Sequence, residues 1–148
     1  METYDGIIAS RYLPGAKVYP KQSTGRIIAS RAFNIFVRSF FPSLSFKDTQ
    51  CGAKIFKKEA ISKIVDKIST TQWAFDINLL YELQKAGLSI KEEPTTWSDT
   101  EYSKLNLKSA GLRMFLSILR LRILNSNFKW LIDVYNKMPE WIKIHHRI

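Results

Sequence analysis

The sequence predicts an α/β fold, because segments with the pattern of strands alternate with segments with the pattern of helices. Two strand-like segments, YDGIIAS (residues 4–10) and LSIKEEPTTW (residues 88–97), flank stretches in which apolar residues recur every three or four positions. The chain has 148 residues, of which 45% are hydrophobic, so it is long enough to bury one core. About three strands are expected, which makes the predicted sheet thin.

Local signals in the sequence place the other elements. A helix is predicted over residues 23–41, because apolar side chains keep helical spacing until Pro42, and Ser23 or Thr24 is its expected N-cap. Residues 12–22 are rich in proline and glycine and are predicted to be a loop. One strand is expected within residues 47–58, and helices are expected over residues 58–68, 71–87 (closed by Gly87), 111–124 and 127–138.

The composition argues against several classes of protein. Aromatic residues make up 13% of the chain, which is unusual for a disordered protein. Cys51 stands alone, so no internal disulfide can form and a reducing compartment is expected. The first six residues, METYDG, lack the pattern of a signal peptide, and no stretch of 18 apolar residues predicts a membrane-spanning helix.

The net charge of +10 is concentrated near the two ends of the chain. Residues 1–47 carry seven Lys and Arg against two Asp and Glu, and residues 108–148 carry eight against two. Residues 48–107 are nearly neutral, with eight against nine. Two surfaces that face anions are therefore expected, either nucleic acid, a phosphorylated small molecule or acidic lipid headgroups. Lysine scattered over the surface for solubility is the alternative.

Asp76 lies in the middle of the apolar stripe of the helix predicted over residues 71–87. A carboxylate there needs a cation, hydrogen-bond donors or a functional role, because its burial without a partner is costly. Alternatively, it accepts backbone N–H groups in the first turn of the helix. Asp48 begins the segment DTQCG and is either a turn residue or part of a site for a polar ligand.

Arg26 and Ser30 are four residues apart and share one face of the predicted helix, so both can reach one phosphate. Arg11 follows the first strand and is a third candidate donor, since ligands of open α/β sheets gather at the carboxyl ends of strands. The alternative is a solvated basic helix face. His145 and His146 have no Cys or carboxylate at metal-ligand spacing, so no zinc site is predicted.

Five segments, in this order, resemble the second half of family-2 glycosyltransferases of the GT-A fold: IIASRYLPG, RIIASRAFN, DTQCGAKIF, WAFDINLL and IKEEPTTWSDTEYSKL. The likeness covers about residues 5–107 and is greatest to the dolichyl-phosphate glucose and mannose synthases. It implies a partial GT-A domain in residues 1–107, the acceptor-side half of a mixed sheet flanked by helices. Residues 108–148 match the family only in character, and they are expected to form a basic, amphipathic helical tail, for which a membrane surface is one of two locations left open.

The resemblance also implies a reaction. A hexose, glucose in preference to mannose, passes from a nucleotide sugar to a polyprenyl or dolichyl phosphate, on a peripheral enzyme at the cytoplasmic face of a membrane. Arg11, Arg26 and Ser30 are then the ligands of the acceptor phosphate, and Asp48 is a catalytic residue near the transferred sugar. Further candidates for supporting roles are Arg31, Gln50, Asp76 and Trp97.

Enzymes of this family carry a nucleotide-binding half with a metal-binding Asp-x-Asp, and these 148 residues contain no such motif. A divalent Mg or Mn ion is therefore expected for the reaction, with ligands that this chain does not supply. Ala53 stands where the family usually has an aromatic residue, and Asn78 where it often has Glu. We expect no transfer unless a separate chain or an N-terminal region supplies the missing half. An open strand edge also predicts a partner chain or self-association.

Two other functions remain open from the sequence. The chain could be a non-catalytic module that binds phosphorylated lipid or an anionic membrane, with Trp130 and Trp141 at the interface. Ordinary packing of the C-terminal helices against the sheet is the competing explanation of their apolar stripes. Nucleic-acid binding is supported by charge and aromatic content alone, without a recognised module, and is not expected.

Overall fold

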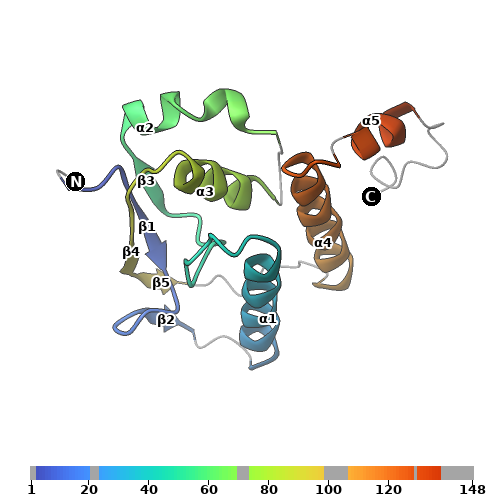
Figure 1. Cartoon of the computed structure of the whole chain (residues 1–148). Coiled ribbons are helices and arrows are strands. Elements are labelled where there is room, and N and C mark those ends of the chain that lie inside the picture. The colour runs from blue at the N-terminus through green and yellow to red at the C-terminus, as the bar shows by residue number, and fades with distance from the viewer. Residues whose placement is uncertain (1–2, 21–23, 70–73, 99–106, 129, 138–148) are drawn as a thin grey trace.

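A computed structural model describes residues 3–20, 24–69, 74–98, 107–128 and 130–137. These residues form a small mixed sheet with helices packed on it, followed by two C-terminal helices (Figure 1). This confirms the predicted fold class, a mixed α/β structure in which a thin sheet is flanked by helices.

The main sheet has three strands in the order β3-β1-β4. The central strand β1 (Gly6–Ser10) is antiparallel to β3 (Lys54–Phe56) and parallel to β4 (Ile90–Pro94). Both neighbours match the strands expected from the sequence. Within the described residues, β3 and β4 are edge strands, and each has one side without a hydrogen-bonded neighbour.

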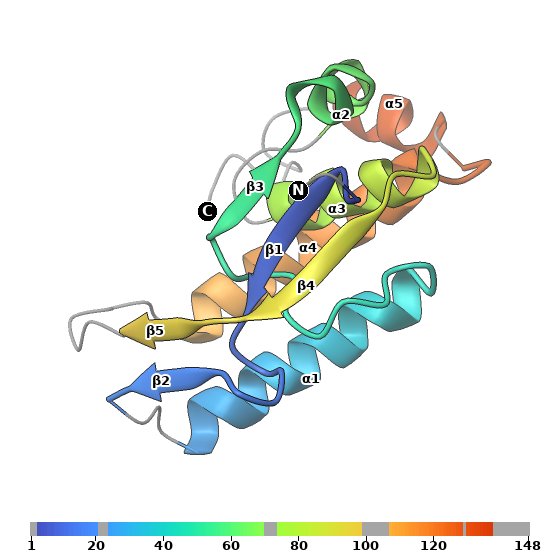
Figure 2. The same ribbon diagram turned by 90° about the vertical axis from the view of Figure 1, so that its left-hand side faces the viewer.

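A second, two-stranded sheet continues from the end of β4. Its strands β2 (Lys17–Tyr19) and β5 (Thr96–Ser98) are parallel, with Val18 opposite Trp97 (Figure 2). The prediction of a loop over residues 12–22 was therefore wrong at β2. Three residues between turn-forming neighbours give too short a pattern to recognise, and pairing with β5 stabilises them.

The helices largely follow the predicted ranges. They are α1 (Thr24–Phe40), α2 (Lys58–Ser62), α3 (Phe75–Lys85), α4 (Leu107–Leu124) and α5 (Trp130–Lys137). The single helix predicted over residues 58–68 is instead α2 followed by a short 3-10 helix, Val65–Lys67. Ile64 and Val65 are β-branched and weaken the α-helix there, while Ile64 is completely buried by tertiary packing. Of the two expected N-caps of the first helix, Ser23 lies outside the described residues and Thr24 is the first residue of α1.

One face of the sheet packs against α1, α3 and α4, and in both views no described helix covers the other face (Figures 1 and 2). The main core joins these elements through Ile8, Val37, Phe41, Leu44, Phe46, Ile77, Leu80, Ile118 and Leu121. Ile118 and Leu121 belong to α4, so the face of this helix that carries them packs into the core. Phe36 and Phe115 add a stacked ring contact between α1 and α4, with centroids 4.9 Å apart.

Two glycines fix positions that the site depends on. A Cβ atom at Gly6 would lie 2.3 Å from the Phe56 ring, so only glycine lets β1 and β3 approach here. Gly87 ends α3 with a φ of 71°, and the N–H of Leu88 donates to the carbonyl of Leu83. This is a Schellman termination at the glycine that the sequence predicted to close the helix, and it directs the chain from α3 into β4.

Candidate functional site

Arg11 and Asp48 form a buried ion pair at the carboxyl end of β1. Arg11 directly follows this strand, and Asp48 lies in the loop after α1. The guanidinium donates from Nε to Oδ2 at 2.7 Å and from Nη2 to Oδ1 at 3.0 Å. The Asp48 side chain is fully buried and that of Arg11 is 14% exposed. Such a two-bond contact fixes both the position and the plane of the guanidinium.

The Asp48 carboxylate receives two further hydrogen bonds. The backbone N–H of Arg11 donates to it at 3.1 Å, and the backbone N–H of Gln50 donates at 3.3 Å. With four donors directed at a buried carboxylate, Asp48 has little capacity left for another partner. The structure therefore places Asp48 as the residue that holds Arg11, and its predicted catalytic role stays a prediction.

The guanidinium of Arg11 keeps its charge at physiological pH. Burial disfavours the charged guanidinium, but the hydrogen bonds and the negative charge of Asp48 outweigh burial and raise the pKa of Arg11 above its ordinary value. A raised pKa means that this stabilisation is complete below the ordinary arginine pKa and is lost only above it. Arg11 is thus a permanent cation, already matched by a fixed anion.

Aromatic rings lie next to the Arg11 guanidinium. Its Cζ atom is 5.5 Å from the centre of the Tyr12 ring and 5.8 Å from the centre of the Trp97 ring. Both distances are in the range of cation–π contacts. The Tyr12 hydroxyl also forms a short hydrogen bond with the hydroxyl of Ser30 on α1. Tyr12 therefore connects Arg11 with Ser30, two of the three predicted phosphate ligands.

The loop that carries Asp48 is held by β4 and α1. The Glu92 carboxylate accepts the backbone N–H groups of Lys47 and Asp48, each at 2.9 Å from Oε1. Asn34 accepts the hydroxyl of Thr49 at 3.1 Å and its backbone N–H at 3.3 Å. Two buried or half-buried polar side chains thus fix the loop, which keeps Asp48 in place for Arg11.

Asp76 forms an ion pair with Lys54, which was one of the alternatives left open by the sequence. It lies in the first turn of α3 and accepts a hydrogen bond from the ammonium group of Lys54 at 2.9 Å. Lys54 is the more buried partner, with 5% of its side chain exposed against 32% for Asp76. Lys54 also donates to the carbonyl of Cys51. This pair fixes β3 to α3, and it is separate from the contacts around Arg11.

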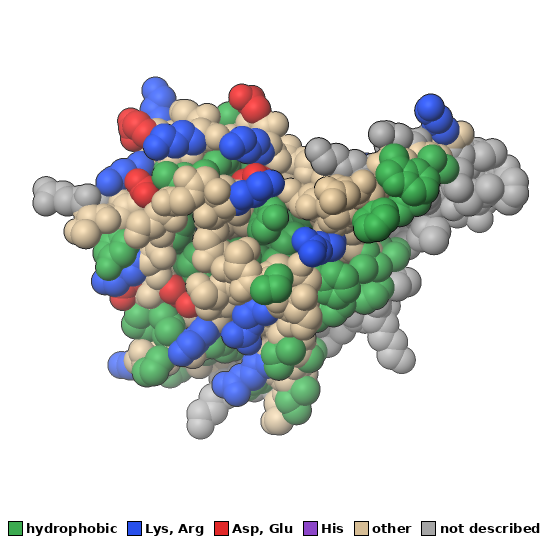
Figure 3. Space-filling model, viewed as in Figure 1, with side chains coloured by type: hydrophobic (Ala, Val, Ile, Leu, Met, Phe, Trp, Pro, Cys, Tyr) green, Lys and Arg blue, Asp and Glu red, His purple; other side chains and the backbone are tan. Residues whose placement is uncertain are grey.

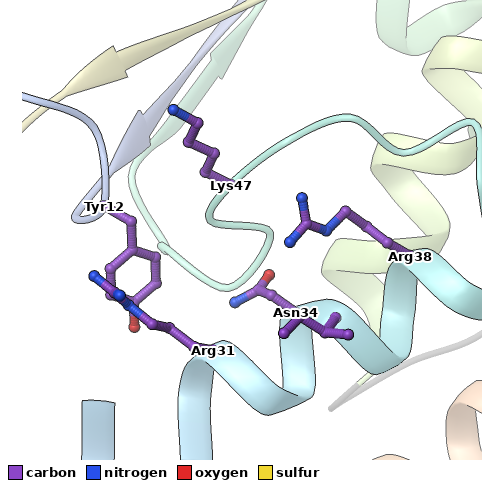
Figure 4. A pocket seen from close by; sticks show the side chains of 6 residues that line it. Tyr12, Arg31, Asn34, Arg38 and Lys47 are labelled. Carbon is purple, nitrogen blue, oxygen red and sulfur yellow. The ribbon is translucent and has the colours of Figure 1, made fainter. Parts of the chain in front are cut away.

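An open cavity of about 330 Å³ lies next to Tyr12 (Figure 4). Its walls come from α1, from the loop after β1 and from the loop after α1. The lining residues are Tyr12, Arg31, Asn34, Ile35, Arg38 and Lys47. Three of these six are cations and none is acidic, so the side chains that line the cavity carry a net positive charge. Several Lys and Arg side chains also gather over α1 on the molecular surface (Figure 3).

The structure thus brings Asp48, Tyr12 and Trp97 together around Arg11, and Tyr12 is bonded to Ser30. The backbone of Gln50 belongs to this group, although its side-chain Nε2 is buried without a hydrogen-bond partner among the described residues. Arg31 lies in the neighbouring cavity, with its Cζ atom 6.0 Å from the centre of the Tyr12 ring. The backbone of Arg26 is part of α1, but its side chain lies outside the described part of the structure.

Sequence reasoning missed five residues of this region: Tyr12, Asn34, Arg38, Lys47 and Glu92. Two of them gave a usable signal. Arg38 is seven residues after Arg31, which places both on one face of a helix. Glu92 shares a strand face with the half-buried Ile90, and a carboxylate on that face needs donors. The other three depend on the path of the loops, which no local pattern specifies.

Neither a metal-binding cluster nor a membrane-spanning helix is found among the described residues. They contain no group of three or more His, Cys, Asp or Glu side chains that could hold a metal ion. The helices among them are too short or too polar to cross a lipid bilayer.

Comparison with known proteins finds similar sequences. A dolichyl-phosphate beta-glucosyltransferase of Dictyostelium discoideum is 32% identical over 124 residues, which are 84% of this chain and 36% of that protein. The human dolichyl-phosphate beta-glucosyltransferase is 35% identical over 92 residues, 62% of this chain and 28% of the relative. Glycosyltransferase AglD of Haloferax volcanii is 33% identical over 117 residues, 79% of this chain and 18% of that protein.

The chain therefore spans between 18% and 36% of the length of these relatives. No protein-family model matches the sequence, and no solved structure matches it. The three similar proteins are nevertheless all glycosyltransferases by name, and they confirm the resemblance seen in the motifs. The chain is thus related to the C-terminal part of family-2 glycosyltransferases of the GT-A fold, and its relatives include several dolichyl-phosphate beta-glucosyltransferases.

Proposed function

We propose that this chain takes part in the transfer of a hexose, glucose in preference to mannose, from a nucleotide sugar to a polyprenyl or dolichyl phosphate. Its contribution is the acceptor side, where Arg11, Arg26 and Ser30 bind the phosphate. The observation that carries the proposal is the buried Arg11–Asp48 pair, which presents a fixed guanidinium next to Tyr12, whose hydroxyl is bonded to Ser30. The printed names of the relatives support the same chemistry.

The chemistry requires positioning more than activation. A phosphate oxyanion is already a nucleophile, so donors that hold it in place and balance its charge provide the main contribution. A guanidinium has five N–H donors, and Asp48 accepts two of those of Arg11, which leaves three for a phosphate. Asp48 acts in this proposal through Arg11, by setting the orientation of its remaining donors.

The nucleotide sugar needs residues beyond those described. No described cluster fits a divalent metal, so we assign the Mg or Mn ion and the nucleotide to a separate chain or to an N-terminal region. We place residues 1–107 on the acceptor side of the transferase domain and residues 108–148 beside the membrane. In this arrangement the protein is peripheral and works at the cytoplasmic face.

Binding of a short-chain polyprenyl phosphate tests the acceptor site. We expect Arg26→Ala and Ser30→Ala each to weaken binding by about tenfold, the loss of one charge-assisted hydrogen bond. Lys63→Ala removes an exposed charge after α2 and should leave binding unchanged. Equal losses in Arg26→Ala and Lys63→Ala would make Arg26 an ordinary surface charge.

Transfer itself is measured by mixing the chain with a nucleotide-binding half, a labelled nucleotide sugar and the acceptor. No transfer with any tested half would count against the proposal.

A second candidate function is membrane binding without catalysis, which the C-terminal helix favours. Large apolar side chains around α5 are exposed, namely Phe128, Trp130, Leu131 and Val134. Aromatic and aliphatic side chains at such a surface suit the interface of a bilayer. Flotation with phosphatidylcholine vesicles tests this: Trp130→Ser should reduce binding if α5 inserts, and unchanged binding would remove α5 from the membrane surface.

A further inference from the structure

We propose that the open cavity beside Tyr12 is a second phosphate-binding site, separate from the acceptor site at Arg11 and Ser30. Arg31, Arg38 and Lys47 supply its positive charge. The ligand is a phosphate group carried either by a soluble ester or by a lipid headgroup. This inference stands on the geometry of the cavity and does not require the transfer reaction.

The three cations that line the cavity come from two elements. Arg31 and Arg38 lie on α1, seven residues apart, which is two helical turns or about 10 Å along the axis. Lys47 comes from the loop that faces the helix, and Figure 4 draws its side chain extended away from α1, with the two arginine side chains on the helix side of this loop. A phosphate held between two faces can accept bonds from several directions, which a single row of surface cations does not provide.

These cations are free of carboxylate partners among the described residues. The ion pairs there join Arg11 to Asp48, Lys54 to Asp76 and Lys91 to Glu93. Arg31 has only its contact with the Tyr12 ring, and neither Arg38 nor the Lys47 ammonium has a bonded partner within this part of the chain. Three unpaired cations in one cavity repel one another, and an anion between them removes this repulsion.

The nearby carboxylates are already in use. The Asp48 carboxylate already accepts hydrogen bonds from the Arg11 side chain and from backbone N–H groups. The Glu92 carboxylate accepts the backbone N–H groups of Lys47 and Asp48. Glu92 thus holds the Lys47 backbone without forming an ion pair with its ammonium group within the described residues. The fold supplies carboxylates to position this loop and leaves the side-chain charge of Lys47 for a ligand.

The neutral lining indicates a phosphate ester. Asn34 is buried at the base of the cavity and uses one amide N–H for the carbonyl of Ser30 at 3.0 Å, which leaves its second N–H as a donor. Ile35 and the Tyr12 ring add apolar surface. The volume of about 330 Å³ is at the lower end of the range for small-molecule sites. An organic group attached to the phosphate therefore has apolar surface to contact.

The experiment compares two double variants that remove the same charge. Arg38→Gln with Lys47→Gln empties the cavity of two cations, whereas Lys63→Gln with Lys67→Gln removes two exposed cations near α2. All four side chains are exposed, so both variants should keep the thermal midpoint of the wild type. A retained midpoint shows that any loss of binding is local.

Two arms distinguish the sources of the phosphate. Pyrophosphate and glycerol 3-phosphate are titrated into the protein, and binding is followed by amide chemical shifts. In the other arm, the protein is sedimented with phosphatidylcholine vesicles that contain phosphatidylglycerol and with vesicles that do not. We expect the cavity variant to lose binding by about tenfold or more in at least one arm, and the α2 variant to change it less than twofold.

Each outcome decides the proposal. Loss confined to the cavity variant supports the site, and the arm in which it occurs identifies a soluble ester or a lipid headgroup as the source. Equal loss in both variants means that binding depends on net charge alone, which overturns the site, as does unchanged binding in both arms. Neither arm contains a polyprenyl phosphate, so the acceptor site is judged separately by the variants of Arg26 and Ser30.

Discussion

Two groups of cations lie near Tyr12, and they differ in how their charge is balanced. Arg11 is largely buried and bonded twice to a carboxylate that is itself fully buried. Arg31, Arg38 and Lys47 are exposed around an open cavity and have no carboxylate partner among the described residues. The sequence presents all of them alike, as basic residues near one another in the N-terminal third.

The difference shows what decides the role of a basic residue here. A cation with a buried carboxylate partner fixes local structure, because breaking the pair leaves an uncompensated charge in the interior. A cation with no such partner contributes little to stability and is available to a ligand. Removing each kind of charge should therefore affect different measurements, stability for Arg11 and its partner, and anion binding for the cavity.

The largest effect is expected from Asp48→Ala. It leaves the Arg11 guanidinium buried without its partner and removes the acceptor of two backbone N–H groups. We expect a loss of about 3–5 kcal/mol in the free energy of unfolding, measured by urea denaturation. Asp66→Ala, which removes an exposed carboxylate, is the control. If Asp48→Ala and Asp66→Ala both lower the free energy of unfolding only slightly, Asp48 is not the partner that holds Arg11.

A smaller effect is expected from Asp76→Ala. The ammonium group of Lys54 would keep only the carbonyl of Cys51 as a partner, with 5% of its side chain exposed. We expect a loss of about 1–3 kcal/mol in the free energy of unfolding. The double variant with Lys54→Met removes both charges and should recover part of that loss. A double variant no more stable than Asp76→Ala would show that the carboxylate acts without Lys54.

The smallest effect is expected from Glu93→Gln. Glu93 is bonded to Lys91 on the surface of β4, with 42% and 44% of the two side chains exposed. This contact raises the pKa of Lys91 through the hydrogen bond and charge of Glu93, but solvent screens it. The urea midpoint of Glu93→Gln should equal that of the wild type. A clear loss of stability would mean that an exposed ion pair stabilises the fold as a buried ion pair does.

Much of the fold followed from local patterns. The buried strand before Arg11, the helix that ends before Pro42 and the glycine that closes α3 were all recognisable from spacing and turn residues. Strand β2 was not, because three residues carry no periodicity and its pairing with β5 joins segments far apart in sequence. The break after α2 was missed for a similar reason, since the burial of Ile64 is a tertiary effect.

The candidate site was only partly predictable. The sequence indicated Arg11, Asp48 and Ser30 as separate residues, but it could not show that Asp48 bonds to Arg11 across 37 positions. The cavity needed the position of Lys47, which Glu92 determines from another strand. Residues on one helix face are predictable from spacing, whereas contacts between loops depend on the complete fold.

Proton exchange at the arginine Nε–H groups, measured by NMR with and without pyrophosphate, tests the contrast between the two groups of cations most directly. In the free protein the Nε–H of Arg11 should exchange slowly, because it is bonded to Asp48, and that of Arg38 should exchange fast. Saturating pyrophosphate should slow Arg38 and leave Arg11 unchanged. Equal exchange of Arg11 and Arg38 in the free protein, or no slowing of Arg38 by pyrophosphate, would contradict the account.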